Sequence, residues 1–239
     1  MASWDIVIPE IFCPFPTTFS DAPHPAAERV GRDVLAHLPA SRASSGLDRT
    51  VAAVRLVDFT GRFYPGSSPQ GLFITMMYSL IFFSHEEWVE SGDIQHHPRP
   101  GEEAARVYDR ALMAFDDATQ STVDDPPFLK MLQPFGQSMR AFGRPDVTSR
   151  FRAALRCFLQ AQAWELNLLR RGEVPALAVY RDLRRHASGI LPAYSLTPLI
   201  FDMHTDDHLL DHVLIRTLIA RLANYASWAN DLLSLSVVP

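Results

Sequence analysis

Two long segments of this sequence are almost entirely apolar and have helical spacing. The first covers residues 70–90 and the second covers residues 209–236. A helix that is apolar on every face is normally buried at the centre of a helical bundle. Polar residues lie near the C-terminal end of each segment, so chemistry is expected at these two ends. The sequence therefore predicts a large bundle built around two central helices.

Proline and glycine divide the rest of the chain into further helical stretches. Apolar spacing predicts a helix after Pro25, a long helix over 206–237, and helices over 47–63, 101–121, 128–143 and 147–171. Residues 1–23 contain four prolines and residues 92–100 are rich in loop formers, so both are expected to be irregular. No stretch alternates with a period of two between hairpin turns. We predict an all-α fold of nine or ten helices, in a single domain over 1–239.

The composition excludes several classes of protein. Hydrophobic residues make up 47% and charged residues 21% of the chain, which is typical of a globular domain. The net charge is −5 and no block of Lys or Arg is present, which argues against nucleic-acid binding. The segment Gly71 to Phe83 is too short to span a bilayer, and Cys13 and Cys157 are too few for a disulfide framework. Without a signal peptide, the expected location is the cytoplasm, with no stable membrane insertion.

Three carboxylates end the first apolar segment. Glu86 and Glu90 are four residues apart and share one helix face, and Glu87 lies beside that face. These acids repel one another unless a cation lies between them, and Mg²⁺ prefers oxygen ligands of this kind. A solvated helix end is the ordinary explanation for such spacing, because Glu is a common surface helix former. The apolar helix that leads into these acids favours a metal site instead.

Two further clusters would complete such a site. Asn230 and Ser234 are also four residues apart, and both offer neutral oxygen ligands. Arg184 precedes Asn230 by 46 residues and is a natural fork for a phosphate. Ser188-Gly189 followed by Pro192 should interrupt the helix after Arg184, which would expose backbone groups to a ligand. Taken singly, each cluster is better explained as a polar helix end or a basic turn.

In this order and spacing, the three clusters resemble a class I terpene synthase of the microbial type. His85-Glu86-Glu87-Trp88-Val89-Glu90 resembles the family's aspartate-rich motif, and Asn230-Asp231-Leu232-Leu233-Ser234 resembles the start of its second metal motif. Thr60-Gly61-Arg62-Phe63-Tyr64-Pro65, Ala163-Trp164-Glu165 and Arg170-Arg171-Gly172-Glu173-Val174-Pro175 are also family-like. The resemblance covers nearly the whole chain. It implies a class I terpenoid synthase-like helical bundle around a central apolar cavity.

The resemblance also implies an activity and a set of site residues. The expected substrate is a prenyl diphosphate, above all the fifteen-carbon farnesyl diphosphate, and the expected product is a sesquiterpene. Three Mg²⁺ ions are implied, with Mn²⁺ as an alternative. The implied metal ligands are Glu86, Glu87, Glu90, Asn230 and Ser234; Arg184 would bind diphosphate, the helix break at Ser188 would face the nascent cation, and Phe82, Phe83 and Tyr78 would line the cavity.

Two departures from the family pattern keep alternatives open. Glutamates replace the aspartates of the first motif, and Val238 stands where the second motif should end in an acid. The family's last helices are expected to be lacking, which would expose the apolar faces of 70–90 and 209–236 and favour self-association. The first alternative is an impaired remnant of the fold that binds diphosphate or acts as a helical interaction module. The second is a prenyl-chain elongase, which the lack of a second aspartate-rich motif argues against.

Four other polar or cysteine features are expected to be structural. Asp116-Asp117 is interpreted as a solvated helix end, and Asp206-Asp207 with Asp211 as a cap for the long C-terminal helix. His96-His97 lacks a partner pair with zinc spacing. Cys157 is expected to be a small apolar core residue.

Overall fold

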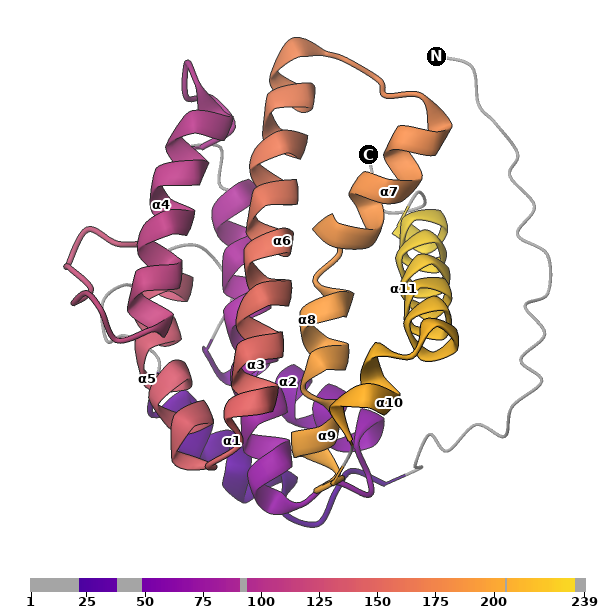
Figure 1. Ribbon diagram of the computed structural model, residues 1–239. Helices are drawn as coiled ribbons and strands as arrows, with labels where there is room; N and C mark the ends of the chain where they lie inside the picture. Colours follow the sequence, from indigo (N-terminus) through magenta and orange to yellow (C-terminus); the bar gives the residue numbers. More distant parts are fainter. Residues whose placement is uncertain (1–21, 38–48, 91–93, 205, 235–239) are drawn as a thin grey trace.

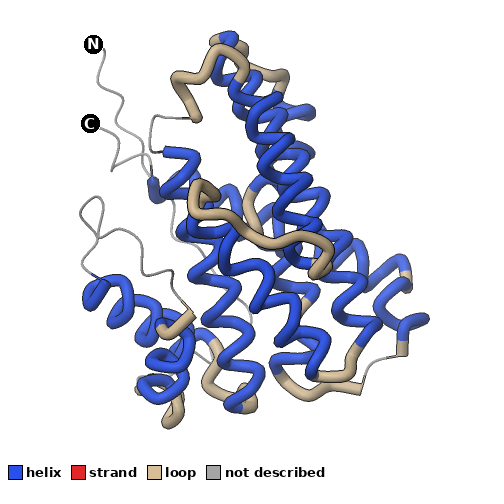
Figure 2. The backbone as a smooth tube through the Cα atoms, turned by 90° about the vertical axis from the view of Figure 1, so that its left-hand side faces the viewer, coloured by secondary structure: helices blue, strands red, loops and turns tan. Residues whose placement is uncertain are grey.

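The computed structural model describes residues 22–37, 49–90, 94–204 and 206–234, and this part of the chain folds as a bundle of helices (Figure 1). The helices are α1 (Ala27–Leu35), α2 (Arg49–Phe63), α3 (Pro69–Glu90), α4 (Pro100–Phe115), α5 (Pro127–Ala141), α6 (Pro145–Arg171), α7 (Leu177–Ala187), α8 (Ile190–Ser195), α9 (Thr197–Ile200), α10 (Asp207–Asp211) and α11 (Val213–Ser234). Among the described residues there is no strand, as the blue and tan tube of Figure 2 shows. The predicted all-α fold is confirmed.

Helix α3 is the central helix that the sequence predicts. Almost every residue from Gly71 to Ile81 is buried, and α3 packs against α1, α2, α5 and α9. Its first turn approaches α9 so closely that a Cβ on Gly71 would lie 2.3 Å from the carbonyl oxygen of Ile200. Three fully buried rings, Phe115, Phe135 and Phe151, pack together with centroids 5.2 to 6.1 Å apart, and the ring of Phe151 also contacts Tyr78 of α3. The core therefore joins α3 to α4, α5 and α6.

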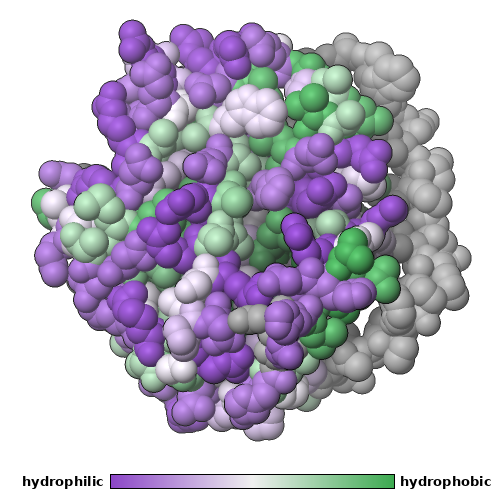
Figure 3. All heavy atoms as spheres, in the orientation of Figure 1, coloured by the Kyte–Doolittle hydropathy of each residue, from purple (hydrophilic) through white to green (hydrophobic). Residues whose placement is uncertain are grey.

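Helix α11 is not central, which corrects the prediction for the second apolar segment. It packs against α7, α8 and α10 at one side of the molecule (Figure 1). Its inner face buries Ala223 and Ser227, whereas Leu214 and Leu218 on its outer face are 69% and 52% exposed. Apolar side chains also gather on this side of the surface in Figure 3. Exposure of apolar residues on the second segment is thus confirmed for residues 209–233, but exposure of the 70–90 helix is wrong from Gly71 to Ile81, where almost every residue is buried.

Local chemistry explains why the structure has eleven helices in its described part instead of nine or ten. The predicted 206–237 helix is broken at His212, whose backbone is extended, with ψ of 135°. The predicted break after Arg184 is confirmed: α7 ends at Ala187, and Gly189 takes a left-handed φ of 71° before α8 begins. The predicted 101–121 helix ends early, at Phe115, two residues before Asp117 takes a φ of 63°.

No helix in the described part of the chain is long and apolar enough to cross a membrane.

Lysine is rare in this sequence. Lys130 is the single lysine of the sequence, and its Nζ donates a hydrogen bond to the carbonyl oxygen of Val123 at 2.6 Å. Arginine therefore provides nearly all the positive charge of the fold.

Candidate functional site

The acidic end of α3 lies within the electrostatic reach of α7. Glu86 is an exposed residue, like Glu87 and Glu90, but partial burial of its carboxyl raises its pKa to about 7. Repulsion from Glu90 contributes to the rise, and attraction by Arg184 opposes it. The carboxyl of Glu86 therefore interacts electrostatically with Glu90 and with Arg184, the predicted diphosphate-binding residue, although Arg184 is far away in the chain.

Arg184 joins α7 to the second predicted motif on α11. Its Nε and Nη2 donate hydrogen bonds to Asp231 Oδ1 at 2.8 and 2.6 Å, and Nη2 also donates to Asn230 Oδ1 at 3.3 Å. Tyr180, one turn earlier on α7, donates its hydroxyl hydrogen to the other oxygen of Asp231. The motif on α11 and the predicted diphosphate-binding arginine are thus in direct contact.

Glu165 of α6 is a further carboxylate of this region that sequence reasoning did not assign to the site. Burial raises the pKa of its carboxyl, Arg184 opposes the rise, and Asp231 adds to it. The family-like tripeptide Ala163-Trp164-Glu165 was the available signal, but nothing in its spacing placed Glu165 beside Arg184. Asp231 and Tyr180 were missed as site residues for the same reason, because their roles depend on how α11 crosses α7.

The break between α7 and α8 is fixed by two neighbouring helices. Tyr78 of α3 donates its hydroxyl hydrogen to the carbonyl oxygen of Gly189 at 2.5 Å, and Gln162 of α6 donates to the carbonyl of Ala187 at 2.6 Å. Between them, the carbonyl of Ser188 has no hydrogen-bond donor among the described residues. Its helical partner would be residue 192, a proline, which has no N–H to donate. The break therefore leaves one free carbonyl between two bonded ones.

The three predicted cavity aromatics lie in different surroundings. Phe82 is half-buried against the break, because a Cβ on Gly189 would lie 2.1 Å from its Cε2 atom. Tyr78 is buried, and its hydroxyl is committed to Gly189. Phe83 is 45% exposed, and its ring contacts Phe59 and Phe82 with centroids 6.2 and 5.9 Å away. Phe82 and Tyr78 thus both lie at the helix break.

Not every predicted metal ligand is brought together. Glu87 and Glu90 are exposed, and in the described part of the chain no group of three His, Cys, Asp or Glu side chains is arranged to hold a metal ion. The side chain of Ser234 lies outside the described residues, as does Val238. Glu86, Glu90 and Asn230 nevertheless offer oxygen ligands of the kind that hard divalent cations prefer. Burial is the main cause of the raised pKa of Glu86, and repulsion from Glu90, which a cation would relieve, adds to it. These residues therefore fit a divalent metal in chemical type.

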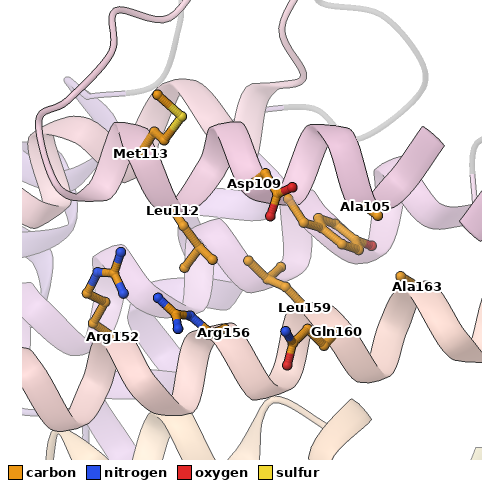
Figure 4. Close-up of a pocket in the computed structure, with 10 residues that line it drawn as sticks. Ala105, Asp109, Leu112, Met113, Arg152, Arg156, Leu159, Gln160 and Ala163 are labelled. Atoms are coloured by element: carbon orange, nitrogen blue, oxygen red, sulfur yellow. The ribbon is translucent and has the colours of Figure 1, made fainter. Parts of the chain in front are cut away.

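Two surface hollows lie away from these residues. One, of about 680 Å³, runs between α4 and α6, and Figure 4 shows Leu112 and Asp109 facing Arg152, Arg156 and Gln160 across it. The other, of about 390 Å³, is lined by residues of α1 and the start of α3 together with Phe142. Neither contains a predicted site residue. The candidate site is therefore defined by the charges and hydrogen bonds around Arg184, and not by either of these two hollows.

His85 is part of the core and not of the acidic cluster that follows it. It is 2% exposed and lies among Trp88, Phe128 and Phe158, and its Nε2 is 2.8 Å from the hydroxyl of Tyr108. Burial lowers the pKa of His85 to about 3, so the ring is neutral at physiological pH. Its Nδ1 has no hydrogen-bond partner among the described residues.

The remaining polar features are mostly structural, as predicted. Asp116 is exposed and pairs with Arg152, and Asp206 caps α10 by accepting a hydrogen bond from the backbone N–H of His208. Asp211 instead pairs with Arg150 at 3.0 Å, and the side chain of Asp207 lies outside the described residues, as does Cys13. Cys157 is exposed, which corrects the prediction that it belongs to the core. In the sequence of α6 it falls between the buried residues Leu155 and Phe158, but its own side chain faces solvent.

Comparison with known proteins places this geometry in a family. A family model described as terpene synthase family 2, C-terminal metal binding, matches residues 80–237. Spiroviolene synthase of Streptomyces violens is 26% identical over 231 residues, covering 95% of this chain and 62% of the relative. The 4-epi-cubebol synthase of Streptosporangium roseum is 23% identical over 230 residues, covering 95% of this chain and 67% of the relative.

Solved structures share the fold. The SVS_A2 protein from ancestral sequence reconstruction superposes with a TM-score of 0.77 at 22% identity, over 95% of this chain and 68% of that protein. An α-eudesmol synthase superposes with a TM-score of 0.72 at 18% identity, over 96% of this chain and 73% of that protein. The bundle is therefore a class I terpene synthase fold, and the family match extends over more than half of the sequence. The chain belongs to terpene synthase family 2.

Proposed function

We propose that this chain binds a prenyl diphosphate together with divalent metal ions, ionises it, and cyclises the resulting cation to a terpene. The observation that carries the proposal is the convergence of three helices on one cation. Glu86 of α3 and Asp231 of α11 both act on Arg184 of α7. An arginine surrounded by oxygen donors suits a diphosphate and the cations that accompany it. Family membership supports the same activity.

The proposed metal ligands are Glu86 and Glu90 on α3 and Asn230 on α11, with Glu87 and Ser234 as further ligands. Their oxygen donors suit Mg²⁺, with Mn²⁺ as the alternative, and the family resemblance leads us to propose three ions. When bound, the metal ions neutralise the diphosphate oxygens and so stabilise the charge of the leaving group.

The other proposed roles follow from the residues around the helix break. Arg184 would hold the diphosphate through the N–H groups that Asp231 leaves free. The carbonyl of Ser188 has no donor among the described residues, so its negative end is available to a carbocation. Phe82 lies against this break and offers a π face to the same cation, with Phe83 and Tyr78 as further aromatic neighbours.

Farnesyl diphosphate is the substrate that we propose first, with a sesquiterpene as the product. The relative from Streptosporangium roseum is named for cyclising (2E,6E)-farnesyl diphosphate.

The test is incubation of the 239-residue chain with farnesyl diphosphate and Mg²⁺, followed by gas chromatography and mass spectrometry of the volatile products. We expect a cyclic hydrocarbon or alcohol, and no product when EDTA removes the metal. Arg184→Gln should lower the rate by about a hundredfold or more, because it removes stabilisation of the leaving group. Arg150→Gln is the matched control, since Arg150 also pairs with an aspartate but lies outside the site.

Failure would take one of three forms. Products no different from solvolysis, together with a clear calorimetric signal for farnesyl diphosphate and Mg²⁺, would leave a binding module without catalysis. Absence of both product and heat would leave a helical scaffold. A product longer than the substrate would identify a chain elongase. Each of these results would overturn the proposed cyclisation.

A further inference from the structure

We propose that Asp231 is a positioning residue, which fixes one edge of the Arg184 guanidinium so that the opposite end is presented to a diphosphate. This inference rests on the proposed function, because it concerns how the same arginine binds its ligand. It adds a residue that the family resemblance did not assign to any role. Asp231 touches Arg184 and acts through it.

The hydrogen bonds between the two side chains involve one edge of the guanidinium. Asp231 Oδ1 accepts from Nε at 2.8 Å and from Nη2 at 2.6 Å, and Oδ2 lies 3.1 Å from Nε. The second hydrogen of Nη2 can reach Asn230 Oδ1 at 3.3 Å. An arginine has five N–H donors in a planar fork. The two on Nη1 have no hydrogen-bond acceptor in the part of the chain that the structure describes, so they are available to a ligand.

The carboxylate is itself held in place from α7. Tyr180 lies four residues before Arg184 on the same helix, and its hydroxyl donates to the Asp231 oxygen that Arg184 uses less. Asp231 thus accepts hydrogen bonds from two successive turns of α7. The side chains of Arg184 and Asp231 are 18% and 29% exposed, so solvent competes only weakly for their bonds. This arrangement leaves the guanidinium little freedom to rotate.

A second carboxylate would redirect Arg184 if Asp231 lost its charge. Glu165 of α6 attracts Arg184, and the attraction acts on the pKa of both groups. Without the charge of Asp231, the guanidinium would turn towards Glu165 and use the Nη1 donors on it. Diphosphate binding would then have to break that contact. We therefore expect weaker binding after neutralisation of Asp231, although the net charge of the site becomes more positive.

The experiment is calorimetric titration of the 239-residue protein with inorganic diphosphate in Mg²⁺ buffer. Asp231→Asn should weaken binding about tenfold, and Asp231→Glu, which restores the carboxylate, should bind within about threefold of the wild type. Asp211→Asn is the matched control, because Asp211 makes a similar two-oxygen pair with Arg150 outside the site. Its affinity should equal that of the wild type.

A spectroscopic readout separates positioning from a general loss of stability. The Nε–H resonance of Arg184, assigned by its absence in Arg184→Lys, should shift in Asp231→Asn and keep its wild-type position in Asp211→Asn. If Asp231→Asn does not fold, Tyr180→Phe decides, since it frees the carboxylate without removing its charge. That variant should lose about threefold in diphosphate affinity, because orientation of the arginine is relaxed.

Three results would overturn the inference. If Asp231→Asn binds diphosphate as tightly as the wild type and the Arg184 resonance does not shift, Asp231 does not position the guanidinium. Where Asp231→Asn is unfolded, wild-type affinity in Tyr180→Phe would do the same. A wild type that binds no diphosphate would overturn the proposed function and this inference together, so the two failures are distinguishable.

Discussion

Substitution of Gly189 by alanine should destabilise the fold at the junction of α7 and α8. Gly189 has a φ of 71°, and a side chain in this left-handed region costs about 1–2 kcal/mol. A Cβ there would also lie 2.1 Å from Cε2 and 2.6 Å from Cδ2 of Phe82, so the ring must move. Insertion of a methyl group into a packed site costs about 1–3 kcal/mol. The expected loss in free energy of unfolding is therefore about 2–5 kcal/mol, from the sum of the two costs.

Gly172 provides a matched control for the backbone cost. It ends α6 with a φ of 64°, and a Cβ there would meet nothing within 4 Å. Gly172→Ala should therefore lose only the conformational cost, about 1–2 kcal/mol. Urea denaturation of both variants, followed by circular dichroism, measures the two free energies of unfolding.

The difference between the two variants reports the collision with Phe82. Phe82→Leu in the Gly189→Ala background should recover part of the loss, because the smaller side chain leaves room for the methyl group. Equal losses in Gly189→Ala and Gly172→Ala, with no recovery from Phe82→Leu, would refute the argument that the ring is packed against the helix break.

Three further predictions concern Tyr78, His85 and α11. Tyr78→Phe removes the donor to the Gly189 carbonyl and should cost about 1–2 kcal/mol in the same denaturation assay; an unchanged midpoint would contradict the bond. The pKa of His85 is lowered to about 3, below its usual 6.5, so the unfolded chain binds more protons between these values. Stability should then fall as pH drops below 6.5, by at most about 1.4 kcal/mol per pH unit, and His85→Gln should show a shallower slope in denaturation series at several pH values. The exposed leucines of α11 should favour self-association, and Leu218→Lys should shift sedimentation towards the monomer; a wild type that is already monomeric at high concentration would contradict this.

Local sequence chemistry predicts the helices and the break well. The apolar run of α3 leaves little choice but burial, and Gly189 with Pro192 cannot continue a regular helix. Cys157 could also have been placed correctly, because Phe151, Leu155 and Phe158 mark the buried face of α6 and Cys157 falls outside that row. The error came from judging the residue by its type and not by its position on the helix.

Contacts between distant helices could not be predicted in the same way. The pairing of Arg184 with Asp231 depends on the crossing of α7 and α11, and Glu165 joins their surroundings from α6. The apolar composition of α11 predicts burial, but its outer face is exposed because only α7, α8 and α10 pack against it in the described part of the chain. Which helices cover a given face depends on the tertiary packing and cannot be read from the sequence of that helix. Sequence spacing predicted Arg184 and Asn230 as site residues, but not Asp231, which pairs with Arg184.

The break after α7 has a mechanical consequence. Hydrogen bonds from Gln162 of α6 and Tyr78 of α3 hold the two carbonyls that flank Ser188, so this end of α7 is fixed in position. Any swing of α7 must then be largest at its N-terminal end and smallest at Ser188. Tyr180 and Arg184 lie along this lever, so a small tilt would carry the guanidinium through a greater arc than the carbonyl. The Ser188 carbonyl, which we propose faces the carbocation, can stay still while Arg184, which we propose binds the diphosphate, moves.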